Sequence, residues 1–175
     1  DYSQYVKIKR DDDDEHGVPF SDADLKILWD NKTNETAEML LIMCYSGWRI
    51  SEYIGLEVNL QKKYFMGGIK TEAGKGRIVP IHSGILPLVE RRISKYGKLL
   101  PCSDKDFRKQ MDELLNRLGI PGDPKHTPHD CRHTFSMLCE KYEVKENDRK
   151  RMMGHSFKAD ITNKVYGHRD IEDLR

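Results

Sequence analysis

Apolar residues recur every three to four positions through most of this sequence, which is the spacing of helices with one buried face. Glycines, prolines and small polar residues interrupt the pattern repeatedly, so it predicts several helices of ordinary length. The predicted helices lie within residues 19–31, 33–47, 50–56, 83–97, 103–120, 127–142, 146–153 and 160–168.

Capping residues mark where several of these helices begin and end. A Ser, Thr or Asn before an apolar run can accept a hydrogen bond from an unpaired backbone N–H of the first turn. Pro128 at the first helical position strengthens one start, and Gly47 is a stop signal for the second helix. The predicted N-caps are Ser21, Asn34 or its neighbour Thr33, Ser103 and Thr127.

The period changes between residues 62 and 82, where apolar and polar residues alternate on both sides of a glycine-containing stretch. This pattern predicts two strands joined by a turn. The expected fold class is therefore mostly α with a small antiparallel β-sheet, an α+β domain without internal repeats.

The 175 residues suit one domain of ordinary size with a real core. The five acids at residues 11–15 repel one another and have nothing to bury, so residues 1–18 are predicted to be an acidic linker. Residues 19–167 form the expected folded domain, and residues 168–175 the start of a C-terminal tail. No signal peptide or apolar span appears, and the four cysteines show no CxxC pair, which favours a reducing cytoplasm and no membrane partner.

Charge is spread unevenly, although the net charge is only +1. Residues 61–100 carry nine bases against two acids, whereas residues 1–30 carry nine acids against four bases. A basic block of this kind indicates a footprint for a phosphate backbone, and the alternative is a solvated face with scattered lysines. The candidate backbone-contacting residues are Lys62, Lys63, Lys75, Arg77, Arg91 and Arg92.

A set of cations, histidines and one tyrosine suits the breaking of a phosphodiester bond. In-line attack on phosphorus spreads negative charge over the non-bridging oxygens, and two guanidiniums can bind those oxygens with bidentate geometry. No tight acidic cluster stands near these motifs to hold Mg²⁺ instead. The set comprises Arg49 in "SGWRISEYIGL", Lys70 in "IKTEAGKGRIVP", His129 and Arg132 in "PHDCRHTF", His155 in "MMGHS" and Tyr166 in "NKVYGH".

The histidines near residue 130 also raise the alternative of a zinc site. His126, His129 and His133 stand close to Cys131. A zinc site needs a rigid set of good ligands, and His133 points to a different face of the predicted helix from His129. We therefore predict no metal and no cofactor.

The order Arg, Lys, HxxR, GH and Tyr resembles the tyrosine recombinase family, also called the phage integrase family. "SGWRISEYIGL" is similar to its first arginine box, "TPHDCRHTF" to its HxxR box and "MMGHSFKADITNKVYGH" to its GH-to-Tyr box. The resemblance covers roughly residues 19–170 and implies the catalytic-domain fold of that family. The long spacing before Tyr166 and the "YGH" ending look most like integrases of conjugative transposons and related mobile elements.

The resemblance implies a role for each motif residue. Arg49 and Arg132 would clamp the scissile phosphate, and His129 and His155 would hydrogen-bond it. Tyr166 would attack phosphorus to form a 3′-phosphotyrosyl link. Lys70 would protonate the leaving 5′-oxygen, with Lys75 as the alternative general acid. Glu52 would steady the guanidinium of Arg49.

The resemblance also implies partners: double-stranded DNA, assembly into a tetramer on DNA, and an accessory DNA-bending protein as a further option. A separate DNA-binding domain would attach at the acidic linker. Two other functions stay open, a type IB topoisomerase and a non-catalytic DNA-binding module. The module predicts loss of Arg49, Arg132 or Tyr166, and the sequence retains all three.

Overall fold

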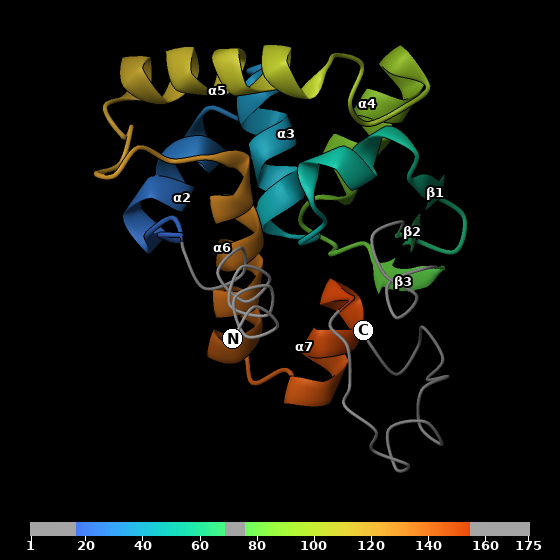
Figure 1. The fold of residues 1–175 in the computed structure, drawn as a ribbon. Helices are drawn as coiled ribbons and strands as arrows, with labels where there is room; N and C mark the ends of the chain where they lie inside the picture. The colour runs from blue at the N-terminus through green and yellow to red at the C-terminus, as the bar shows by residue number, and fades with distance from the viewer. Residues whose placement is uncertain (1–16, 69–75, 155–175) are drawn as a thin grey trace, which may run out of the picture.

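The structure is a computed structural model that describes residues 17–68 and 76–154 (Figure 1). Its elements confirm the expected fold class, mostly α-helical with a small antiparallel sheet. In chain order they are α2 (Asp22–Asp30), α3 (Glu35–Cys44), η1 (Ile50–Ile54), β1 (Glu57–Asn59), β2 (Tyr64–Gly67), β3 (Arg77–Pro80), α4 (Leu86–Tyr96), α5 (Asp104–Leu118), α6 (Pro128–Lys141) and α7 (Glu146–Met153).

Helix α3 forms the centre of the core. All six residues from Met39 to Cys44 are fully buried, because this helix is apolar on every side and is covered on every side. Helices α2, α4, α5 and α6 all pack against it, and Figure 1 shows α5 running across its upper end. The loop that follows α3 carries Arg49, so a fully buried helix precedes that residue.

The predicted N-caps are confirmed at four helices. Ser21 Oγ accepts a hydrogen bond from Asp24 N at 3.1 Å, and Ser103 Oγ does the same for Asp106 N. Asn34, rather than Thr33, caps α3. Thr127 is the N-cap of α6, with Pro128 as its first helical residue. Helix α3 ends at Cys44, slightly before the predicted stop at Gly47.

The sheet contains one more strand than predicted. Strands β2 and β3 are the predicted pair, and β1 joins the other edge of β2 in antiparallel pairing. The three residues of β1, Glu57–Asn59, include one apolar residue, which is too few to show an alternating pattern. The predicted helix at 50–56 is a short 3₁₀ helix, η1.

The start of the described chain is fastened to α6. Val18 N donates to Asp130 Oδ1 at 3.3 Å, and Phe20 N donates to Thr134 Oγ1 at 2.9 Å. Most of the predicted linker, and the predicted helix at 160–168, lie outside the described residues. Among the described helices, none has the length and apolar character needed to cross a membrane.

Candidate active site

The turn before Arg49 has a fixed conformation. Gly47 adopts a φ of 75°, a left-handed conformation that favours glycine, and a Cβ there would overlap the ring of Phe135. The Tyr53 hydroxyl lies 2.6 Å from Ser46 Oγ and accepts from Trp48 N at 3.2 Å. Burial raises the pKa of Tyr53 well above its ordinary value, so this tyrosine is a neutral structural group.

Glu52 connects the Arg49 turn to strand β3. Its Oε1 accepts the backbone N–H of Arg49 at 2.9 Å and lies 3.8 Å from the Arg49 guanidinium. The same oxygen accepts from Arg77 Nη2 at 3.0 Å. The Glu52 side chain is fully buried, so both arginines pair with it away from bulk water. The predicted support of Arg49 by Glu52 therefore has a third member that the sequence did not indicate.

Arg77 is a buried residue and lies against the ring of Trp48. Its guanidinium carbon is 4.0 Å from the ring centroid, and only 5% of its side chain is exposed. Burial lowers the pKa of Arg77 and the Glu52 carboxylate opposes that change, while the nearby Arg49 charge adds to it. Three buried polar atoms meet here without a hydrogen-bond partner in the described part of the chain: Trp48 Nε1, Glu52 Oε2 and Arg77 Nε.

Arg132 joins the three described motif segments. Its guanidinium donates from Nη1 to Gly47 O at 2.7 Å and from Nη2 to Met153 O. Gly47 is two residues before Arg49, and Met153 is two residues before His155. Arg132 is 1% exposed, so these bonds form in a dry interior where each is strong.

His129 lies in the first turn of α6, where unpaired backbone N–H groups and the helix dipole favour an anion. Its ring meets that of His133 edge to face at 5.0 Å between centroids. His126 Nδ1 lies 2.7 Å from Asp130 Oδ2, which also accepts from Thr127 N. This network caps α6. Over residues 17–68 and 76–154, no cluster of three metal-binding side chains appears.

Four of the predicted site residues lie outside the described residues: Lys70, Lys75, His155 and Tyr166. The structure brings the other motif residues together through Arg132, whose bonds tie the α6 HxxR segment to the Arg49 turn. The described site is therefore a set of two arginines, one histidine and the carboxylate of Glu52.

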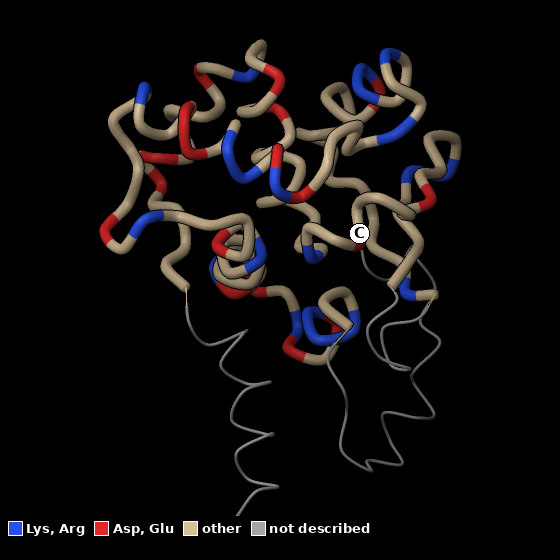
Figure 2. The backbone as a smooth tube through the Cα atoms, turned by 45° about the horizontal axis from the view of Figure 1, so that its top comes forward, with Lys and Arg blue, Asp and Glu red and all other residues tan. Residues whose placement is uncertain are grey.

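The basic block of residues 61–100 is not one exposed stripe, and Figure 2 shows Asp and Glu interleaved with Lys and Arg along the chain. Arg92 is 4% exposed and donates to Leu99 O, Glu35 O and Glu38, so its prediction as a DNA contact is wrong. Arg77 is corrected in the same way, because its partners are Glu52 and Trp48.

The other described members of that block are more open. Arg91 is half-exposed but donates to Glu38 and to Lys32 O. Lys62 and Lys63 are exposed in the turn between β1 and β2. These two lysines are the described residues that remain candidates for contact with a phosphate backbone.

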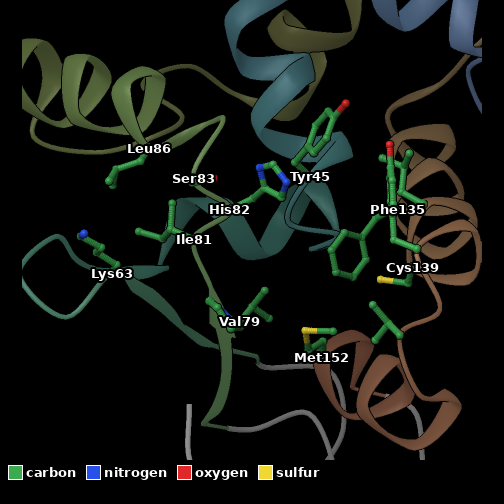
Figure 3. Close-up of a pocket in the computed structure, with 14 residues that line it drawn as sticks. Tyr45, Lys63, Val79, Ile81, His82, Ser83, Leu86, Phe135, Cys139 and Met152 are labelled. Atoms are coloured by element: carbon green, nitrogen blue, oxygen red, sulfur yellow. The ribbon is translucent and has the colours of Figure 1, made fainter. Parts of the chain in front are cut away.

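A cavity of about 520 Å³ has a lining that includes Phe135 and Met152 of two motif segments but not Arg49, His129 or Arg132. Figure 3 shows its wall formed by Val79 and Ile81 at the end of the sheet, Phe135 and Cys139 of α6, and Met152 of α7. The lining is mainly apolar, which does not suit a phosphate.

Comparisons with known proteins agree on one family. The sequence model described as the phage integrase family matches residues 20–172. The tyrosine recombinase XerC of Bradyrhizobium diazoefficiens is 28% identical over 156 residues, which cover 79% of this chain and 47% of that protein. The chain therefore spans about half the length of that curated relative.

Two solved structures have the same fold. A crystal structure of XerA recombinase matches with a TM-score of 0.68 and 19% identity, covering 90% of this chain and 60% of that one. A structure of the Tn1549 transposon integrase in complex with circular intermediate DNA matches with a TM-score of 0.65 and 19% identity, covering 89% of this chain and 62% of that one.

Proposed function

This chain belongs to the phage integrase family, and from that membership we propose that it is the catalytic part of a site-specific tyrosine recombinase. The Tyr166 oxygen attacks phosphorus and forms a 3′-phosphotyrosyl bond, while the bond from phosphorus to the 5′-oxygen breaks. Lys70, or Lys75 in its place, gives that oxygen a proton. A 5′-hydroxyl then attacks the phosphotyrosyl bond and releases Tyr166. Because the covalent link keeps the bond energy, rejoining needs no nucleotide.

The observation that carries the proposal is the bridging position of Arg132. Its two carbonyl partners hold it between the turn that carries Arg49 and the end of α7. A guanidinium fixed in this way beside the turn that carries Arg49 is preorganised to act with Arg49 on the charge that develops on the non-bridging oxygens. His129, at the N-terminal turn of α6, adds a hydrogen-bond donor from the side of that helix.

The partners follow from the same proposal. Double-stranded DNA is the substrate, and strand exchange between two sites uses four copies, with an accessory DNA-bending protein as an additional partner. The Tn1549 integrase, one of the structural matches, was solved with circular intermediate DNA. This similarity supports integration and excision of a mobile element. We place the protein on DNA in a bacterial cytoplasm, where its four free thiols suit a reducing environment.

Two competing functions predict different behaviour. A type IB topoisomerase would relax supercoiled DNA as a single copy, without a second DNA site. A non-catalytic module would bind DNA without forming a covalent link. The buried network around Arg49 and Arg132 favours an enzyme, because a module that binds only the phosphate backbone has no need of preorganised guanidiniums.

Covalent trapping tests the proposal. The chain is incubated with EDTA and a nicked duplex that carries the element end and loses its leaving strand after cleavage. We expect a slow-migrating protein–DNA band on a denaturing gel, and no such band for Tyr166→Phe. Relaxation of supercoiled plasmid at the same rate as this cleavage would instead favour the topoisomerase. Absence of the band, both for this chain and for a version extended with a preceding DNA-binding domain, would favour the non-catalytic module.

A further inference from the structure

Glu52 has two cationic neighbours, and they are not equivalent. Arg77 makes the close ion pair, with 3.0 Å between Nη2 and Oε1, whereas the Arg49 guanidinium stays 3.8 Å from the same oxygen. Arg49 instead gives its backbone N–H to that oxygen at 2.9 Å. Glu52 therefore fixes the backbone of Arg49 while its strongest charge contact goes to Arg77.

The charges of this trio explain why a second arginine is useful. A buried carboxylate attracts any nearby guanidinium strongly, so Glu52 alone would compete with DNA for Arg49. With Arg77 present, the two arginines and one carboxylate sum to +1. The carboxylate makes its close ion pair with Arg77, so it holds the Arg49 guanidinium less closely than it would if Arg77 were absent.

Arg77 is itself held so that it does not leave Glu52. Its guanidinium is stacked on Trp48 at 4.0 Å, and the Trp48 ring is 1% exposed. Arg77 begins β3, and Lys70 and Lys75 lie seven and two residues before it in the sequence. One side chain thus connects the strand after the candidate general acids to the turn that carries Arg49.

We propose that Arg77 is a positioning residue for the phosphate-binding Arg49: it pairs with Glu52 and so leaves the Arg49 guanidinium directed toward the DNA phosphate. This inference rests on the proposed recombinase function. It assigns Arg77 to the cleavage step through Arg49, without contact between Arg77 and DNA.

A double-variant cycle tests the charge argument. Arg77→Met leaves the trio with no net charge, so cleavage of the trapping duplex should slow about 10- to 100-fold as Glu52 draws Arg49 inward. Adding Glu52→Gln restores a sum of +1, and the double variant should recover to within about fivefold of the unchanged chain. Arg77→Lys keeps the charge and should retain more of the rate than Arg77→Met.

A second substrate separates this role from a merely structural one. A duplex with a methylphosphonate at the mapped cleavage position lacks the phosphate's negative charge. On that duplex, Arg77→Met should slow cleavage by less than about threefold. The reason is that an uncharged methylphosphonate gains little from the net positive charge of the trio. A variant that is only poorly folded would lose the same factor on both duplexes.

Arg92→Met is the matched control. Arg92 is another buried arginine paired with a buried glutamate, at 3.2 Å from Glu38, and lies in α4 away from Arg49. Arg92→Met should lower stability, while the ratio of the cleavage rates on the phosphate and methylphosphonate duplexes should stay unchanged.

The outcomes separate the inference from the proposed function. Equal Arg77→Met losses on both duplexes, with no recovery in the double variant, would overturn the inference while the unchanged chain still forms its Tyr166-dependent adduct. No adduct from the unchanged chain would overturn the proposed function and this inference with it.

Discussion

Two buried glutamates in this domain are each shared by two arginines, yet the two clusters are built differently. Glu38 of α3 binds Arg91 and Arg92, which are neighbours on α4. Glu52 of η1 lies between Arg49 and Arg77, which come from separate segments of the chain. The first cluster joins two helices, and the second lies beside the candidate active site.

The difference lies in how completely the polar atoms are paired. At Glu38 both carboxylate oxygens accept from guanidiniums, and backbone carbonyls of Lys32, Glu35 and Leu99 accept further N–H groups. At Glu52 one oxygen, Oε1, accepts both from the Arg49 backbone N–H and from Arg77, and Oε2 has no hydrogen-bond partner among the described residues. A fully bonded network fixes structure, and the less completely bonded cluster is the one beside the candidate active site.

The largest effect should come from Arg49 itself. Arg49→Ala removes a guanidinium that we propose binds the transition state, so the rate of cleavage in the trapping assay should fall about 10²- to 10³-fold. DNA affinity, measured by fluorescence anisotropy at fixed salt, should change little, because the rest of the surface still contacts the backbone.

Arg108→Ala is the comparison for that variant. Its guanidinium pairs with Asp104 on an exposed face of α5, so both rate and affinity should stay at the level of the unchanged chain. If Arg49→Ala lost affinity and rate by the same factor, Arg49 would be a binding residue and the contrast between the two glutamate clusters would disappear.

The next largest effect is a loss of stability, and we expect it at the Glu38 cluster. Glu38→Gln leaves the buried guanidinium of Arg92 without its counter-charge, and the free energy of unfolding should fall by about 3–5 kcal/mol. Urea unfolding followed by circular dichroism at pH 7 measures the change. Glu52→Gln should lose less, because Glu52 makes one close guanidinium contact, to Arg77, whereas Glu38 makes two. A larger loss for Glu52→Gln would reverse the assignment of structural and functional clusters.

The sequence predicted the helices well because their signals are local. Caps such as Ser21 and Asn34 act within one turn, and the apolar period repeats within each helix. Strand β1 was missed because its stability comes from pairing with β2 and hardly from its own three residues.

The candidate site could be predicted only in part, for a related reason. Motif spacing indicated Arg49, His129 and Arg132, but Arg77 meets Glu52 across 25 positions and Arg132 meets Gly47 across 85. No local pattern encodes such contacts. A count of charges also treats every base as exposed, and so it assigned Arg77 and Arg92 to a DNA-contacting surface.

The smallest effect should come from the solvent-exposed edge of the Glu38 cluster, where Glu35 accepts from Lys95 and from the Tyr96 hydroxyl. The hydrogen bond from Lys95, followed by that from Tyr96, lowers the pKa of Glu35 below its ordinary value. Since the pKa is lower in the folded state, the stabilising contribution is present above the unfolded pKa and is lost as pH falls through the folded one. Urea unfolding of Glu35→Gln should therefore show a slight loss of stability at pH 7, because water screens this exposed pair, and a smaller loss at pH 3. A loss of the same size at both pH values would mean that Glu35 acts by packing, as an uncharged extension of α3.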